Sequence, residues 1–141
     1  ITSKKSEGSI TGFTANSFTS VSLEPALILF CLNKDASSTD FFSKGAPFGV
    51  TILHDQQIDL SNRFSNPNLS SSERFKDVAL RADTSAPILK NCLAWLNGTI
   101  VSKIDGGDHW ILIGEVKQGA IEQESASPLL YARGQYNTLP S

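Results

Sequence analysis

The sequence predicts a mainly β protein, built as a small barrel or sandwich and not as a βαβ fold. Two features of the 141 residues lead to this prediction. Apolar runs of strand length recur along the chain with turn-forming residues between them, and segments with helical spacing are few and short. Antiparallel closure would also cover the edges that so many strands create. The length suits one domain over residues 1–141.

The predicted strands differ in how strongly the residues mark them. The clearest is Ala26–Leu32, an apolar run with a proline just before it, which is typical of a strand buried on both faces. Asn91–Asn97 continues past Gly98 to Ile104, so we expect one long strand with a bend or bulge at the glycine. The remaining strands are expected at Gly8–Phe13, whose signal is weak, and at Pro47–Leu53, His109–Val116 and Pro128–Tyr136.

Helical signals are confined to three short segments. Asp55 is a good N-cap for a helix that runs to about Phe64, because apolar side chains recur there at a spacing of four residues. Ser72–Phe75 fits a single turn after a polar loop. A third short helix would start at residue 37 or 38 and cover the two phenylalanines at 41 and 42.

Composition excludes several classes of function. The formal charge of -2 lacks the basic surplus of a general nucleic-acid binder. The longest apolar run, Ala26–Leu32, is far short of the roughly 20 residues that a membrane-spanning helix needs, so neither nucleic acid nor membrane is expected as a partner. Cys31 and Cys92 lie in apolar stretches, which favours buried free thiols in the cytoplasm over a disulfide or a redox role. Only two histidines and no Cys/His cluster are present, so no metal site is expected.

Two polar segments have the composition of a ligand site. Thr14–Ser22 is rich in small hydroxyl and amide side chains without charge, which would let a polar ring approach the backbone closely. The alternative is an ordinary edge strand rich in Ser and Thr. Asn33–Thr39 follows a predicted strand and offers hydroxyls, helix N-terminal N–H groups and the charge of Lys34 to a phosphate. Simple helix capping is the alternative there.

Two further segments place chemically active side chains near turns. Gly106–His109 makes a tight turn before a strand, where His109 would contact a ligand or shuttle a proton, unless it is only a polar turn residue. Near the C-terminus, Arg133 would pair with a phosphate, and Tyr131 and Tyr136 would stack on a flat ring. Core packing for Tyr131 and a surface ion pair for Arg133 are the alternatives. No hydrolase arrangement and no phosphate-binding glycine motif is present, so functions of those kinds are not predicted.

Taken in order, these segments resemble the short-chain flavin reductase family, which has a flavin reductase-like domain with the FMN-binding split barrel fold. The resemblance covers almost the whole chain, and the stretch Gly12–Pro25 is fairly specific. The other matching stretches are Leu29–Lys34, Val50–Leu53 with Gln57, Arg63 and Phe64, Gly107–His109 with Gly114–Val116, and Pro128–Tyr136.

The resemblance implies a Greek-key split β-barrel that forms a homodimer, with FMN or FAD bound near the interface. It also implies an oxidoreductase, an NAD(P)H:flavin oxidoreductase, that transfers a hydride from NADH or NADPH to the flavin and supplies reduced flavin to a partner monooxygenase. An FMN-binding electron carrier of the flavoredoxin type, without nicotinamide oxidase activity, is one alternative. A split barrel that binds no flavin and serves interaction alone is the other.

The resemblance further implies which residues meet the ligands. Orientation of the two rings would suffice for the reaction, so no catalytic acid or base is assigned, and His109 is the one candidate. The nicotinamide nucleotide would dock at His109, Tyr131, Arg133 and Gly134. The flavin would be held by Thr14, Ala15, Asn16, Ser17, Phe18 and Ser20 along the ring, by Asn33, Ser37, Ser38 and Thr39 along the ribityl chain and phosphate, and by Gln57, Arg63 and Phe64 near its tail.

Some features depart from the family pattern. Phe13 stands where relatives often have methionine, and Ala36 stands where a serine is common. The family usually begins with a helix and a barrel strand before Gly12. Because the sequence also contains no methionine, and so no translation start, we expect that helix and first strand to exist in the full protein and to be missing from this sequence.

Overall fold

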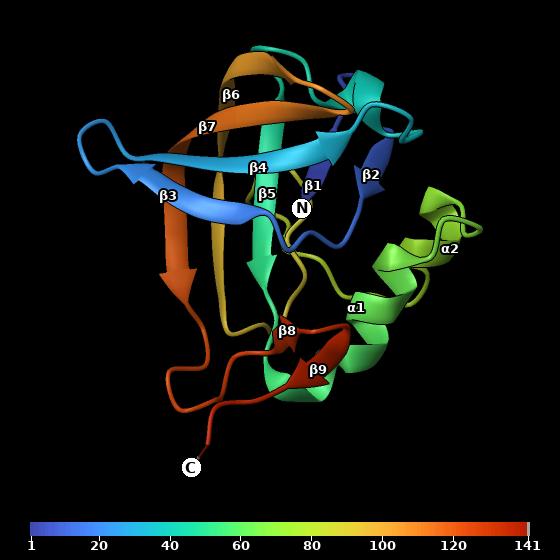
Figure 1. Cartoon of the computed structure of the whole chain (residues 1–141), viewed down its shortest axis with the longest axis vertical. Coiled ribbons are helices and arrows are strands. Elements are labelled where there is room, and N and C mark those ends of the chain that lie inside the picture. Colours follow the sequence, from blue (N-terminus) through green and yellow to red (C-terminus); the bar gives the residue numbers. More distant parts are fainter. Residues whose placement is uncertain (141) are drawn as a thin grey trace.

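A curled antiparallel sheet forms the body of the protein in the computed structural model, which describes residues 1–140 (Figure 1). Its strands are β1 (Thr2–Lys4), β2 (Ile10–Gly12), β3 (Phe18–Ser22), β4 (Leu27–Asn33), β5 (Pro47–Ile52), β6 (Ala94–Gly106) and β7 (His109–Ile121). They are hydrogen-bonded in the order β2-β1-β5-β6-β7-β4-β3, so the two edge strands, β2 and β3, leave the barrel split between them. The predicted mainly β fold with a split barrel is confirmed.

The helices are short, and two of them lie together beside the sheet (Figure 1). They are the 3₁₀ helices η1 (Thr39–Phe41) and η2 (Asp55–Gln57) and the α-helices α1 (Ile58–Ser65) and α2 (Ser71–Phe75). The predicted N-cap at Asp55 is wrong, because His54 caps this segment instead. The His54 ring accepts a hydrogen bond from the Gln56 N–H, and the Gln57 side chain accepts one from the His54 N–H.

The long hairpin of β6 and β7 bends where the sequence predicts it. The pairing register shifts between Asn97 and Gly98, and again between Ile100 and Ser102. A Cβ at Gly98 would overlap the carbonyl of Glu115, so the close approach of the two strands requires glycine there. Strand β7 runs past the predicted end at Val116, because the residues that follow it pair with the first part of β6.

The main core lies inside the curl of the sheet. Alternate residues of β4, namely Ile28, Phe30 and Leu32, are buried against Phe48 and other apolar side chains of the facing strands. The prediction that β4 is buried on both faces is wrong, because its intervening side chains on the outer face are only half-buried. The strand belongs to an antiparallel sheet with one packed face.

The C-terminal segment forms a separate hairpin and not the single strand predicted at Pro128–Tyr136. Strand β8 (Leu130–Ala132) pairs with β9 (Gln135–Asn137) in a two-stranded sheet. The two residues between them, Arg133 and Gly134, both have positive φ, at 53° and 76°. Two successive left-handed residues are typical of the tightest hairpin turns, which explains why the segment folds back on itself here.

Near the N-terminus, the weak strand signal at Gly8–Phe13 corresponds to β2, and β1 precedes it without a clear signal in the sequence. Cys31 is half-buried and Cys92 is buried, and both thiols are free. Over residues 1–140, no helix has the length and apolar character needed to cross a membrane. A single domain, a cytoplasmic location, and a helix and first barrel strand missing from this sequence stay predictions.

Candidate functional site

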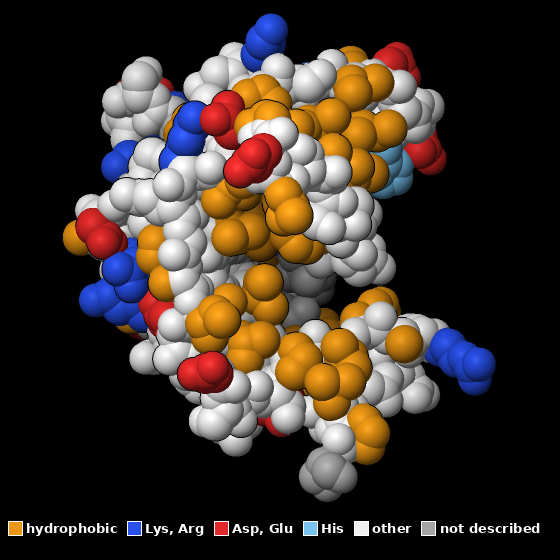
Figure 2. All heavy atoms as spheres, turned by 90° about the vertical axis from the view of Figure 1, so that its left-hand side faces the viewer, with side chains coloured by type: hydrophobic (Ala, Val, Ile, Leu, Met, Phe, Trp, Pro, Cys, Tyr) orange, Lys and Arg blue, Asp and Glu red, His pale blue; other side chains and the backbone are white. Residues whose placement is uncertain are grey.

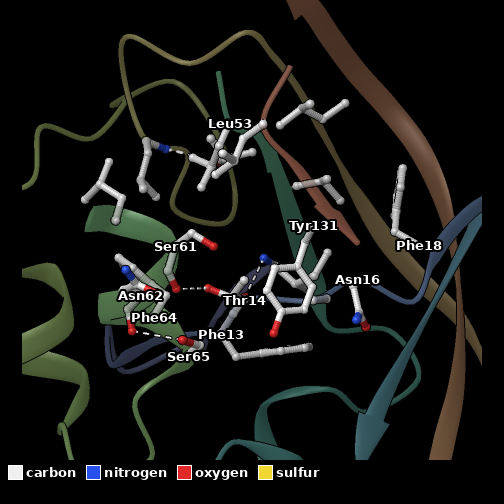
Figure 3. A pocket seen from close by; sticks show the side chains of 18 of the residues that line it. Phe13, Thr14, Asn16, Phe18, Leu53, Ser61, Asn62, Phe64, Ser65 and Tyr131 are labelled. Carbon is white, nitrogen blue, oxygen red and sulfur yellow. Dashed lines mark hydrogen bonds between the residues drawn. The ribbon is translucent and has the colours of Figure 1, made fainter. Parts of the chain in front are cut away.

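A cavity of about 570 Å³ opens between the segment from Phe13 to Phe18, helix α1 and the β8–β9 hairpin (Figure 3). From the outside, the molecule is hollowed, with apolar side chains around the hollow (Figure 2). The cavity is lined by Ile1, Thr2, Phe13, Thr14, Ala15, Asn16, Phe18, Val50, Thr51, Ile52, Leu53, Leu60, Ser61, Asn62, Phe64, Ser65, Leu89, Leu129, Tyr131, Gly134 and Tyr136.

The chemical character of this lining is neutral. No Asp, Glu, Lys, Arg or His side chain is among the described residues that form it. Hydroxyl and amide groups alternate with aromatic and aliphatic surfaces, and the volume is in the usual range for small-molecule sites. Such a lining favours a flat, uncharged ring with polar edges over a phosphate or carboxylate.

Hydrogen bonds on both sides hold the segment Thr14–Phe18 in place. The Thr14 N–H donates to the Phe64 carbonyl at 3.2 Å, and the Thr14 hydroxyl donates to the Ser61 carbonyl at 2.7 Å. At the other end, the Cys31 N–H donates to the Ser17 carbonyl at 3.3 Å. The segment is therefore fixed between helix α1 and strand β4, and Figure 3 shows its contact with the helix.

Three backbone N–H groups in the middle of this segment have no acceptor. Among residues 1–140, the amides of Ala15, Asn16 and Ser17 donate no hydrogen bond to backbone or side chain. Ala15 and Asn16 line the cavity. Unpaired N–H groups at a cavity wall can stabilise a partial or full negative charge on a ligand.

The β8–β9 hairpin closes the cavity on the opposite side. The Tyr136 hydroxyl lies 3.0 Å from both Ser61 Oγ and Asn62 Oδ1, which joins the hairpin to α1. The Tyr131 ring lies 5.1 Å from that of Tyr136, measured between centroids. Tyr131 is 53% exposed and leans over the cavity on the side of Asn16 (Figure 3). An exposed aromatic ring at a cavity mouth is suited to stacking on a second ring.

A second polar region lies at the end of β4, where the chain passes into η1. Asn33 is paired with His109 across the β4–β7 ladder, so the structure brings these two predicted residues together. Lys34 Nζ lies 2.9 Å from Asp105 Oδ1, and this ion pair holds the pKa of Asp105 below its ordinary value. His109 Nδ1 lies 2.7 Å from Asp108 Oδ1, and this hydrogen bond lowers the pKa of Asp108. Across residues 1–140, no group of three Cys, His, Asp or Glu residues has the arrangement of a metal site.

The hydroxyl groups next to Asn33 are held differently from one another. The Thr39 hydroxyl donates to the Ala36 carbonyl at 2.7 Å, whereas the side chain of Ser38, at the N-cap of η1, makes no capping hydrogen bond. Ser37 is exposed. Ser38 precedes the helix as its N-cap, but its hydroxyl does not bond to the helix. Helix capping therefore does not explain why a serine stands at this position.

The structure places the predicted ligand residues in three groups. The first lines the cavity and comprises Thr14, Ala15, Asn16, Phe18, Phe64, Tyr131 and Gly134. The second lies around the end of β4 and comprises Asn33, Ser37, Ser38, Thr39 and His109. The third lies outside the cavity lining and comprises Ser17, Ser20, Gln57, Arg63 and Arg133.

Several members of the third group have other contacts in the structure. Gln57 is buried, and its amide accepts from the His54 N–H and donates to the Asn91 carbonyl. The Arg63 guanidinium donates to the Lys76 carbonyl at 2.9 Å. Ser20 is exposed within β3, and Arg133 is exposed in the β8–β9 turn.

Sequence reasoning misses cavity residues that come from other parts of the fold. The polar ones on α1 are Ser61, Asn62 and Ser65; Thr51 comes from β5, and Leu53 directly follows that strand. Ser61 and Phe64 are separated by one helical turn, so a helical wheel would place them on one face. No pattern in the sequence indicates that this face meets the C-terminal hairpin.

Comparisons with known proteins agree on one family. A family model described as "Flavin reductase like domain" matches residues 1–140. The reductase component of a flavin-dependent trigonelline monooxygenase from Acinetobacter baylyi is 37% identical over 139 residues, which cover 98% of this chain and 43% of that protein. A flavin reductase from Pseudomonas putida is 33% identical over 137 residues, which cover 96% of this chain and 78% of that one.

A solved structure gives the same result. The NADH:FAD oxidoreductase of Streptomyces globisporus, solved in complex with NAD and FAD fragments, superposes with a TM-score of 0.85 at 31% identity, covering 99% of this chain and 82% of that one. The chain spans less than half of the length of the first curated relatives it matches, 43% in both cases. Relatives of this kind therefore extend beyond the domain described here.

Proposed function

This chain belongs to the flavin reductase-like domain family, and we propose that it is an NAD(P)H-dependent flavin reductase acting on FMN or FAD. The observation that carries the proposal is the neutral cavity with the unpaired backbone N–H groups of Ala15 and Asn16 on one wall, followed by the unpaired N–H group of Ser17 just outside the lining. An isoalloxazine ring is flat and uncharged when oxidised, and it gains negative charge along one edge when reduced. The lining fits that ring, and the unpaired N–H groups fit its polar edge.

The proposed flavin site extends from the cavity toward the end of β4. The ring would lie along Thr14–Phe18 and against Phe64, with Ser61 and Asn62 of α1 on the same wall. The phosphate would lie outside the neutral cavity, near the residues from Asn33 to Thr39, where Lys34 supplies a positive charge that is paired with Asp105 in the structure. The flavin would also pass near four residues outside the cavity lining, namely Ser17, Ser20, Gln57 and Arg63.

The chain's own contribution to the reaction is binding, orientation and electrostatics. Bound flavin would accept a hydride at N5 from the C4 atom of NADH or NADPH. The N–H groups of residues 15–17 stabilise negative charge at the ring edge, and the aliphatic part of the cavity lining limits access of water. Tyr131, Gly134, Arg133 and His109 form the proposed nicotinamide side, where stacking sets the distance between the rings at about 3–3.5 Å. No side chain is required to move a proton.

A second copy of the chain is the proposed cover for the outer face of β3, β4 and β7. Leu29 and Cys31 of β4 pair with Ile113 and Ile111 of β7, and all of these residues are only half-buried there. Val21 of β3 is 46% exposed, and apolar side chains gather on this side of the molecule (Figure 2). A contiguous apolar face of this kind is typical of a subunit interface. Sedimentation analysis should give twice the chain mass, and a monomer at micromolar concentration would contradict the dimer.

Relatives named as reductase components of monooxygenases support a further proposal. Reduced flavin made by this protein would be supplied to a partner monooxygenase, which consumes it with oxygen. The Tyr131 side chain, at the cavity mouth, is 53% exposed. This opening to solvent would allow the reduced flavin to leave the site.

The direct test is an assay of purified protein with each combination of NADH or NADPH and FMN or FAD. We expect loss of nicotinamide absorbance that depends on added flavin, with a preference for one nucleotide. No oxidation with any combination would contradict the proposal. Tightly bound FMN that is reduced only by a protein donor would indicate the electron carrier instead, and protein that fails to bind any flavin would indicate an interaction domain.

A further inference from the structure

Arg74 is a partly buried cation without an acidic partner among the described residues. Its Nη1 donates to the Gly12 carbonyl at 2.7 Å, and its Nη2 donates to the Asn66 carbonyl at 2.7 Å. Its Nε is buried and has no acceptor. The neighbouring carboxylate of Glu73 is bonded to Ser70 in the capping box of α2 and does not pair with it. Burial lowers the pKa of the Arg74 guanidinium, which stays charged at neutral pH.

The two carbonyls that Arg74 binds lie at the ends of two walls of the cavity. Gly12 ends β2 and leads directly into the lining segment Phe13–Phe18. Asn66 is the C-cap of α1, whose residues Leu60, Ser61, Asn62, Phe64 and Ser65 line the adjoining wall. The planar guanidinium of Arg74 therefore links the two walls through one hydrogen bond to each. A cation is also favoured at the C-terminal end of a helix such as α1.

The backbone and side chains next to the Arg74 guanidinium are closely packed. A Cβ at Gly12 would lie 2.9 Å from a ring atom of Phe64, so the backbone passes close to the aromatic pair behind the cavity. Phe64 and Phe75 pack edge to face with centroids 5.0 Å apart, and Phe75 follows Arg74 in α2. The hydrogen bond from the Thr14 N–H to the Phe64 carbonyl lies next to this packing.

We propose that Arg74 is a positioning residue that holds the segment Phe13–Phe18 against α1, so that the flavin cavity is formed before the ligand binds. The part of this inference that concerns flavin rests on the proposed function. The part that concerns the segment itself does not, because these hydrogen bonds join residues of this chain only. If the segment leaves its place in a fraction of molecules, the apparent Kd for any cavity ligand rises in inverse proportion to the competent fraction.

The test compares Arg74→Met with Arg81→Met. Arg81 is also a structural arginine, bonded to Asp83 and Glu122 at 3.0 Å and stacked on Trp95, but it lies outside the cavity lining. We expect both variants to lower the melting temperature. Only R74M should raise the Kd for FMN, by about tenfold if the competent fraction falls to about one tenth, while R81M stays within about twofold of the wild type.

A second readout does not depend on any ligand. Hydrogen exchange of the peptide covering residues 12–18 should be faster in ligand-free R74M than in the wild type, because the Thr14 amide loses protection, and it should be unchanged in R81M. Arg74→Lys keeps the charge but reaches only one carbonyl, so it should fall between wild type and R74M, and it serves if R74M does not fold.

The outcomes separate the two proposals. Wild-type exchange and wild-type FMN affinity in R74M, or in R74K where R74M does not fold, would overturn the role of Arg74. The same would follow if R81M shows the same losses as R74M, because the effect would then be one of general stability. A wild-type protein that binds no flavin, together with faster exchange only in R74M, would overturn the proposed function and leave the positioning role intact.

Discussion

Replacing Tyr136 by Phe should loosen the wall that closes the flavin cavity. The Tyr136 hydroxyl lies 3.0 Å from Ser61 Oγ and 3.0 Å from Asn62 Oδ1. A phenol has a single proton, so it donates to the Asn62 amide oxygen and accepts from the Ser61 hydroxyl. Asn62 is exposed and can bond to water after the substitution, whereas Ser61 is only 3% exposed and would keep an unpaired hydroxyl.

The size of the effect follows from these two bonds. A neutral hydrogen bond stabilises a protein by about 1 kcal/mol net, and a buried polar group left without a partner costs about 1–3 kcal/mol. With one bond replaced by water, we expect a loss of about 1.5 kcal/mol in the free energy of unfolding. In a domain of this size, that corresponds to a fall of about 5 °C in Tm.

Thermal unfolding followed by circular dichroism measures this fall. Tyr131→Phe is the matched control, because the Tyr131 side chain is 53% exposed and its hydroxyl makes no hydrogen bond within residues 1–140. The Tm of Y131F should equal that of the wild type within about 1 °C. If the Tm of Y136F equals that of the wild type, or if the Tm of Y131F falls as much as that of Y136F, the stabilising role of the Tyr136 hydroxyl is refuted.

Four further predictions concern the core, the nicotinamide side and the thiols. Gly114→Ala should cost about 2 kcal/mol in urea unfolding, because its Cβ would overlap the buried ring of Phe48, and an unchanged midpoint would contradict this packing. His109→Ala should raise KM for the nicotinamide nucleotide about tenfold with the flavin Kd unchanged, and equal loss of both would count against the assignment. Burial raises the pKa of Cys92 to about 11, so in the folded protein alkylation at neutral pH should label half-buried Cys31 first, as peptide mass spectrometry can show. Because the folded state then holds the Cys92 proton more tightly than the unfolded state, stability should fall between about pH 9 and about pH 11, and a flat profile there would contradict the raised pKa.

Local patterns predict most of the sheet, because strand signals arise from neighbouring residues. The buried run of β4 and the bulge at Gly98 are both visible in the sequence, the latter because glycine inside a strand marks a close approach. The run does not indicate that the outer face of β4 is only half-buried in the chain, since that depends on what covers the sheet. The β8–β9 turn is missed because Arg133 adopts positive φ, which an arginine side chain does not signal.

The candidate site likewise contains residues that the local sequence indicates and residues that it does not. Composition makes Thr14–Phe18 a candidate beside the alternative of an ordinary edge strand, and the family resemblance selects it; in the structure, four of its five residues line the cavity. Ser61 and Asn62 are not identified, since their role depends on the contact between α1 and a hairpin far along the chain. Gln57 shows another limit of local patterns, because its side chain takes part in a capping box with His54 that the sequence analysis does not predict.

The position of the flavin ring is tested most directly by amide chemical shifts recorded while FMN is titrated into the protein. We expect saturable shifts of the Ala15, Asn16 and Ser17 amides, which have no acceptor among residues 1–140. The amide of Lys117, on the exposed end of β7, should not move. Shifts that spare residues 15–17, or no saturable shifts at all, would contradict the claim that this cavity holds the flavin.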